Sequence, residues 1–74
     1  MVTEQPDGES RSELARVEGE IAALREQVRD LRERSGDESD PADRGELITA
    51  AQEQEEVLAE LEARRDDLQR RLAT

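Results

Sequence analysis

Two stretches of the chain place large aliphatic residues at the alternating spacing of three and four that is typical of a coiled coil. The first stretch is unbroken: Leu14, Val17, Ile21, Leu24, Val28 and Leu31. The second is less regular, because a glutamine and an arginine take two of its positions: Leu47, Ala51, Gln54, Leu58, Leu61, Arg65, Leu68 and Leu72. This spacing predicts two amphipathic helices, each with one apolar seam.

Residues with strong helix-end preferences predict where the first helix begins and ends. Ser10 and Glu13 have the spacing of a capping box, so we expect the helix over residues 11–34. Ser35 and Gly36 predict its end, because glycine tolerates the left-handed conformation that terminates helices. Residues 1–9 are then expected to form a flexible acidic arm.

The second helix is expected over residues 41–73. Asp40 is a favourable cap, and Pro41 suits the first helical position, where its missing N–H costs nothing. Between the helices, residues 36–40 form a short acidic tip.

A turn this short favours an antiparallel arrangement, so residues 10–74 are predicted to form an all-α, two-helix coiled-coil hairpin. Facing residues should have numbers that sum to about 78 if the chain folds symmetrically about the tip. Leu31 would then face Leu47, and Val17 would face Leu61. Two ion pairs are expected beside the seam: Arg25 with Glu55, and Glu13 with Arg64.

The unequal lengths of the predicted helices leave Leu68 and Leu72 beyond the start of the first helix. Two uncovered leucines predict an association surface, with fraying of the chain end as the alternative. The size of the chain also favours association. A chain of 74 residues without cysteine usually needs a partner or a second copy to bury enough apolar surface for a stable core. Two hairpins forming a four-helix bundle are one such assembly.

Composition excludes several classes of function. The chain has no His, Cys, Phe, Tyr or Trp, and it carries 21 acids against 11 bases, for a net charge of −10. It therefore lacks a thiolate zinc site, the commonest general base and a stacking platform for nucleic-acid bases. A phosphate backbone would be repelled, so we expect neither an enzyme nor direct nucleic-acid binding.

High charge with low hydrophobicity is also typical of disorder, but the regular seam argues against it. No apolar run is long enough to span a membrane, and the first residues do not resemble a signal peptide. The expected location is therefore the cytoplasm.

The segment with the most functional information is the turn, where Asp37, Asp40 and Asp43 recur at every third residue. Its spacing is not that of an EF-hand, so neither an intrinsic metal site nor a cofactor is predicted. Asp40 and Asp43 could instead share a Mg²⁺ ion with a partner, because Mg²⁺ accepts one or two carboxylates together with other ligands.

The segment from Asp40 to Gly45 reads Asp-Pro-Ala-Asp-Arg-Gly and resembles the D-x-x-D-x-A tip motif of the DksA/TraR family of RNA polymerase regulators. The Gre transcript-cleavage factors carry a similar acidic hairpin tip. The resemblance covers the hairpin only: Gly45 replaces the alanine, and the cysteines of the DksA-type zinc finger are absent. It implies a hairpin that enters the secondary channel of RNA polymerase, with Asp40 and Asp43 near the active-site Mg²⁺ and Arg44 within the motif.

Three further interpretations remain open. Asp40 and Asp43 can be explained as helix-capping residues alone, because acids favour the first turn of a helix. The hairpin can be a structural or adaptor coiled coil that forms a homodimer. It can also be a subunit that folds on a larger partner. At most, a Gre-like tip would assist transcript cleavage that the polymerase itself catalyses.

Overall fold

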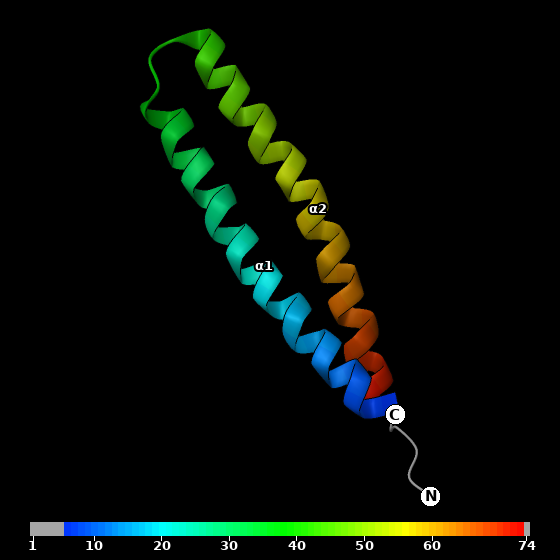
Figure 1. The fold of residues 1–74 in the computed structure, drawn as a ribbon. Helices are drawn as coiled ribbons and strands as arrows, with labels where there is room; N and C mark the ends of the chain where they lie inside the picture. The colour runs from blue at the N-terminus through cyan, green and yellow to red at the C-terminus, as the bar shows by residue number, and fades with distance from the viewer. Residues whose placement is uncertain (1–5, 74) are drawn as a thin grey trace, which may run out of the picture.

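Two long α-helices pack side by side in opposite directions (Figure 1). The computed structural model describes residues 6–73, with α1 at Pro6–Asp37 and α2 at Pro41–Ala73. Residues 38–40 link the two helices, and the described residues contain no strand. The predicted all-α hairpin is confirmed, as are the predicted bounds of the second helix.

The first helix begins earlier than its capping box indicates. Pro6 is its first residue, a position that proline favours because its φ angle is already helical and its missing N–H would have no partner there. The expected flexible arm over residues 1–9 is therefore wrong for residues 6–9, which belong to α1. Residues 1–5 lie outside the described range.

The first helix also ends later than predicted, because Gly36 does not terminate it. Neither Gly36 nor any other described glycine has a positive φ angle, and α1 continues to Asp37. Ser35 occupies the next seam position after Leu31 and is buried, and its hydroxyl donates a 2.8 Å hydrogen bond to the carbonyl of Arg32. The tip linker consequently shrinks from the predicted 36–40 to 38–40.

The predicted seam forms the core of the hairpin. Four apolar side chains are buried in the described range: Val17, Ile21, Ala51 and Leu68. Val17, Ile21 and Leu68 form one cluster, and Leu14, Leu58 and Leu61 pack against it while remaining half-buried. The core is thus a thin line between two helices.

Ion pairs on the two flanks of the seam define the register of the helices. On one flank, Arg25 pairs with Glu62 at 2.7 Å and Arg32 with Glu55 at 2.6 Å, and both pairs of residue numbers sum to 87. On the other flank, Arg64 pairs with Glu13 at 2.6 Å, with a sum of 77.

A seam residue of α1 therefore lies opposite the seam residue of α2 for which the two residue numbers sum to 82, the mean of the sums on the two flanks. The predicted sum of about 78 is wrong, because the helices do not fold symmetrically about the linker. The predicted pair Glu13–Arg64 is confirmed, whereas Arg25 bonds to Glu62 rather than to Glu55.

This register also changes both ends of the hairpin. The register places Leu68 level with Leu14, inside the cluster with Val17, so Leu68 is 0% exposed. The early start of α1 extends the interface to Leu72, which is half-buried. The expectation that these leucines are uncovered is wrong, and Leu68 cannot serve as an association surface while the hairpin is folded. At the opposite end, the first turn of α2 projects beyond the end of α1 (Figure 1).

Replacing Gly19 with alanine is expected to raise the free energy of unfolding by about 0.5–1 kcal/mol, because glycine loses more backbone entropy than alanine in a helix. Gly19 lies in the middle of α1, its φ angle is not positive, and an added Cβ would meet nothing within 4 Å. Urea unfolding followed by circular dichroism measures the change. The matched control is Ala23→Gly on the same helix, which should lower stability by a similar amount. Equal stability of Gly19→Ala and the wild type would contradict the prediction.

Candidate functional site

The tip consists of residues 38–40 and the first turn of α2, and its backbone places Asp40 at the start of the helix. The N–H of Arg44 donates a 2.9 Å hydrogen bond to the carbonyl of Asp40, which is the first hydrogen bond of α2. Asp40 is therefore the cap residue and Pro41 the first helical residue, as the sequence predicts.

Glu38 organises the linker, a role that no sequence pattern predicts. Its carboxylate oxygen Oε1 accepts a 3.0 Å hydrogen bond from the N–H of Asp40. Its backbone carbonyl accepts two hydrogen bonds from the guanidinium of Arg44, at 3.0 Å from Nε and 2.8 Å from Nη2. Arg44 thus ties the first turn of α2 to the linker. An acid two residues before the cap was the only sequence signal for this arrangement.

The carboxylates of Asp40 and Asp43 are exposed, and within the described residues neither takes part in a hydrogen bond or an ion pair. Asp40 occupies the cap position without using its side chain as a cap. Asp37 is the last residue of α1 and is also exposed. The outermost turn of the hairpin therefore presents carboxylates that no contact of the described chain neutralises.

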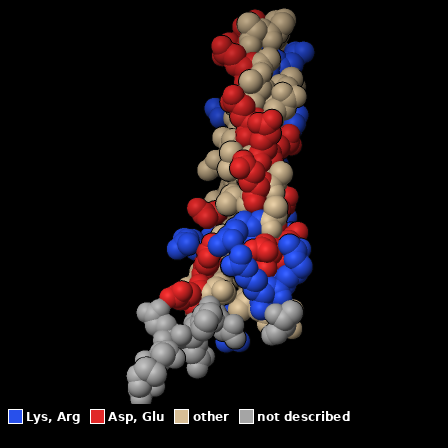
Figure 2. Space-filling view, turned by 90° about the vertical axis from the view of Figure 1, so that its right-hand side faces the viewer, with Lys and Arg blue, Asp and Glu red and all other residues tan. Residues whose placement is uncertain are grey.

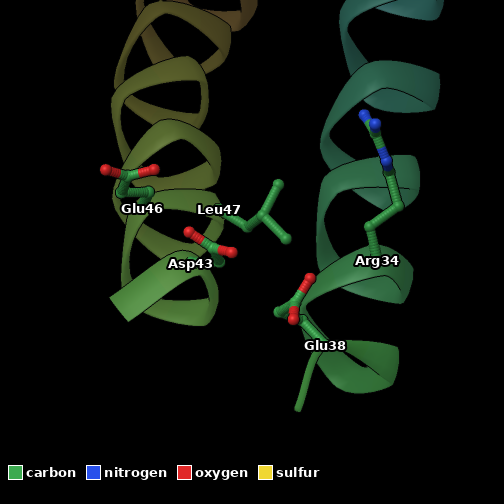
Figure 3. A pocket seen from close by; sticks show the side chains of 5 residues that line it. All are labelled: Arg34, Glu38, Asp43, Glu46 and Leu47. Atoms are coloured by element: carbon green, nitrogen blue, oxygen red, sulfur yellow. The ribbon is translucent and has the colours of Figure 1, made fainter. Parts of the chain in front are cut away.

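Beside the tip lies a shallow hollow of about 310 Å³ lined by five residues: Arg34, Glu38, Asp43, Glu46 and Leu47. Figure 3 shows the Leu47 side chain reaching across the space between the helices, with the carboxylates of Asp43 and Glu38 on its linker side. The hollow is open and mostly charged, so it is not a typical pocket for a small apolar ligand.

The predicted acids do not form a metal site by themselves. Among residues 6–73, no three acidic side chains are placed so that they could hold a metal ion together.

Charge is distributed unevenly along the hairpin. Residues 26–60, which include the tip, carry 12 acids and four bases, for a net charge of −8. The rest of the chain, residues 1–25 and 61–74, carries nine acids and seven bases, for a net charge of only −2. Figure 2 shows acidic side chains over the tip half of the molecule and a group of arginines over the other half.

Comparisons of the chain with protein families, with curated proteins and with solved structures gave no match. The evidence for the two-helix hairpin therefore comes from the structure, and the resemblance to channel-binding regulators depends on the tip motif. Neither described helix is both long and apolar enough to cross a membrane.

Proposed function

We propose that the hairpin is a transcription regulator that binds RNA polymerase and places its acidic tip in the secondary channel, near the active-site Mg²⁺. The observation that supports this most directly is the state of Asp40 and Asp43. Their carboxylates are exposed and unbonded at the turn that projects farthest from the rest of the molecule (Figure 1). Carboxylates used only for capping would be hydrogen-bonded to the N–H groups of the first turn.

The geometry of the tip suits insertion into a narrow, Mg²⁺-containing site. The hairpin is only two helices wide, and its Cα trace spans 15 by 14 Å along the two short axes. The hydrogen bonds between Arg44 and Glu38 hold the projecting turn in place. The tip would act through charge near the ion, while the flanks of the helices supply affinity. The protein would have no catalytic activity of its own.

The decisive variant is Asp40→Asn with Asp43→Asn, which removes two charges and changes little else. Asparagine is as good a cap residue as aspartate, and neither carboxylate is bonded in the structure, so the hairpin should keep its helicity. We expect retention on immobilised RNA polymerase to be unchanged and the effect on transcription in vitro to be lost. Full transcriptional activity of this variant would contradict the proposal.

The matched control is Glu53→Gln with Glu60→Gln. Both residues are exposed on α2 away from the tip, and the net charge changes by the same amount. This control should behave like the wild type if position at the tip matters. Equal loss of activity in both double variants would show that only total charge is involved.

A structural or adaptor coiled coil is the second candidate function. Only four apolar side chains of the described hairpin are fully buried, which favours a protein that is completed by association. Failure of RNA polymerase to retain the wild-type chain would favour this candidate, including the version in which the chain is a subunit of a larger assembly.

A further inference from the structure

The two flanks of the helix interface are closed to different extents. One flank is closed by the ion pairs of Arg25 with Glu62 and of Arg32 with Glu55. On the other flank, Glu13 and Arg64 pair at the open end of the hairpin. No ion pair joins the helices across the middle of this second flank within the described residues, and Val57 is 49% exposed there.

This second flank, which we call the Val57 face, consists of two rows in which every seventh residue points to the same side. The α1 row contains Glu13, Glu20, Gln27 and Arg34, and the α2 row contains Asp43, Ala50, Val57 and Arg64. The pair Glu13–Arg64 joins the rows at one end, and Arg34 and Asp43 line the same hollow at the other. Each row has an acid at one end and an arginine at the other.

Such rows are self-complementary when a second copy is turned end over end. In α2, Asp43 then faces Arg64 of the second copy, and Ala50 faces Val57 of the second copy. In the same arrangement, Glu13 in the α1 row faces Arg34 of the second copy. Glu20 faces Gln27 of the second copy. No like charges meet within these rows, which is the condition for electrostatic complementarity.

The opposite flank does not have this property. Its α1 row has Arg25 followed seven residues later by Arg32, and its α2 row has Glu55 followed by Glu62. Turning a second copy end over end about the middle of these pairs brings arginine opposite arginine and glutamate opposite glutamate. The complementarity is therefore specific to the Val57 face.

Charge along the whole hairpin favours the same orientation. An end-over-end arrangement puts the tip half, with a net charge of −8, beside the half of the second copy whose net charge is only −2. An arrangement with both tips at the same end would put the two acidic halves together, which is unfavourable.

We infer that the Val57 face binds a second copy of the chain, so that two hairpins form an antiparallel four-helix bundle. The exposed Val57 would be covered by Ala50 of the second copy, and the thin core would gain a second layer of side chains. This inference does not depend on RNA polymerase, and it can hold whether or not the proposed function is correct.

Sedimentation equilibrium of the full chain over a range of concentrations tests the inference. Salt at about 0.15 M limits the repulsion between acidic chains to a distance of about 8 Å. The wild type should sediment as a dimer at the higher concentrations. Val57→Glu should raise the dissociation constant about tenfold or more, because it removes the contact with Ala50 of the second copy and places another carboxylate level with Glu20 at the centre of the interface.

The matched control is Ala59→Glu. Ala59 is exposed on the outer side of α2, and the substitution adds the same charge to the same helix. This variant should dimerise as the wild type does, and circular dichroism should show equal helicity in both glutamate variants. A wild type that stays monomeric throughout, or equal dimerisation of Val57→Glu and the wild type, would overturn the inference.

Single cysteines test the orientation, since the natural chain has none. An oxidised mixture of Ala50→Cys and Val57→Cys proteins should form mixed disulfide dimers, because these positions face each other between copies. Crosslinking of Ala50→Cys only with itself, or the absence of mixed dimers, would overturn the end-over-end arrangement.

Discussion

Replacing Leu68 with alanine is expected to lower the free energy of unfolding by about 2–5 kcal/mol, because it leaves a cavity in a core that cannot collapse to fill it. Leu68 is 0% exposed and belongs to the same cluster as Val17 and Ile21. Small domains are stable by only about 5–15 kcal/mol, so this single change should remove a large share of the stability. Thermal and urea unfolding followed by circular dichroism would measure the loss.

Leu72→Ala is the matched control for Leu68→Ala. Leu72 lies one turn later on the same helix and is only half-buried, so its truncation should cost clearly less. The comparison separates burial from the effect of removing any leucine near the end of the chain. A smaller loss for Leu68→Ala than for Leu72→Ala would show that α1 does not cover the end of α2.

Replacing Gln54 with leucine is expected to raise the free energy of unfolding by about 1–3 kcal/mol, which is the cost of burying a polar group without a partner. Gln54 occupies a seam position of α2, and within the described residues its Oε1 atom is buried and accepts no hydrogen bond. Leucine removes that unsatisfied oxygen and adds apolar surface to the seam. The register places Gln54 level with Val28, so the new side chain would meet another aliphatic residue.

Gln52→Leu is the control for Gln54→Leu, because Gln52 is exposed on the same helix and its replacement should change stability by less than about 0.5 kcal/mol. All variants should be unfolded at the same protein concentration, since self-association adds to apparent stability. A loss of stability in Gln54→Leu would mean that the amide has a partner in solution.

The seam and the second helix could be predicted from sequence because both depend on local patterns. The spacing from Leu14 to Leu31 fixes which face of α1 is buried, and Asp40 with Pro41 fixes the start of α2. The ends of α1 were harder to predict, because a capping box or a glycine allows a helix to begin or end there but does not require it. Ser10 lies inside the helix, and Gly36 continues it although glycine also allows a stop.

The register could not be predicted because it depends on both helices at once. Local spacing allows several alignments that differ by one turn, and the choice follows from which arginines reach which glutamates and from how well Leu68 is covered. The same is true of the tip. Asp40 and Asp43 were identified from the motif, whereas the role of Glu38 depends on the path of the linker, which no residue pattern records.

The position of the best-buried cluster has a consequence for how the hairpin folds and opens. Val17, Ile21 and Leu68 lie near the open end, far from the linker in sequence, so their contacts close a long loop. Folding that starts at the linker would form the weaker part of the seam first and reach the strongest contacts late. Opening from the chain ends, in turn, would break those contacts early. Amide hydrogens along both helices should therefore exchange together, in one cooperative opening, rather than progressively from the termini.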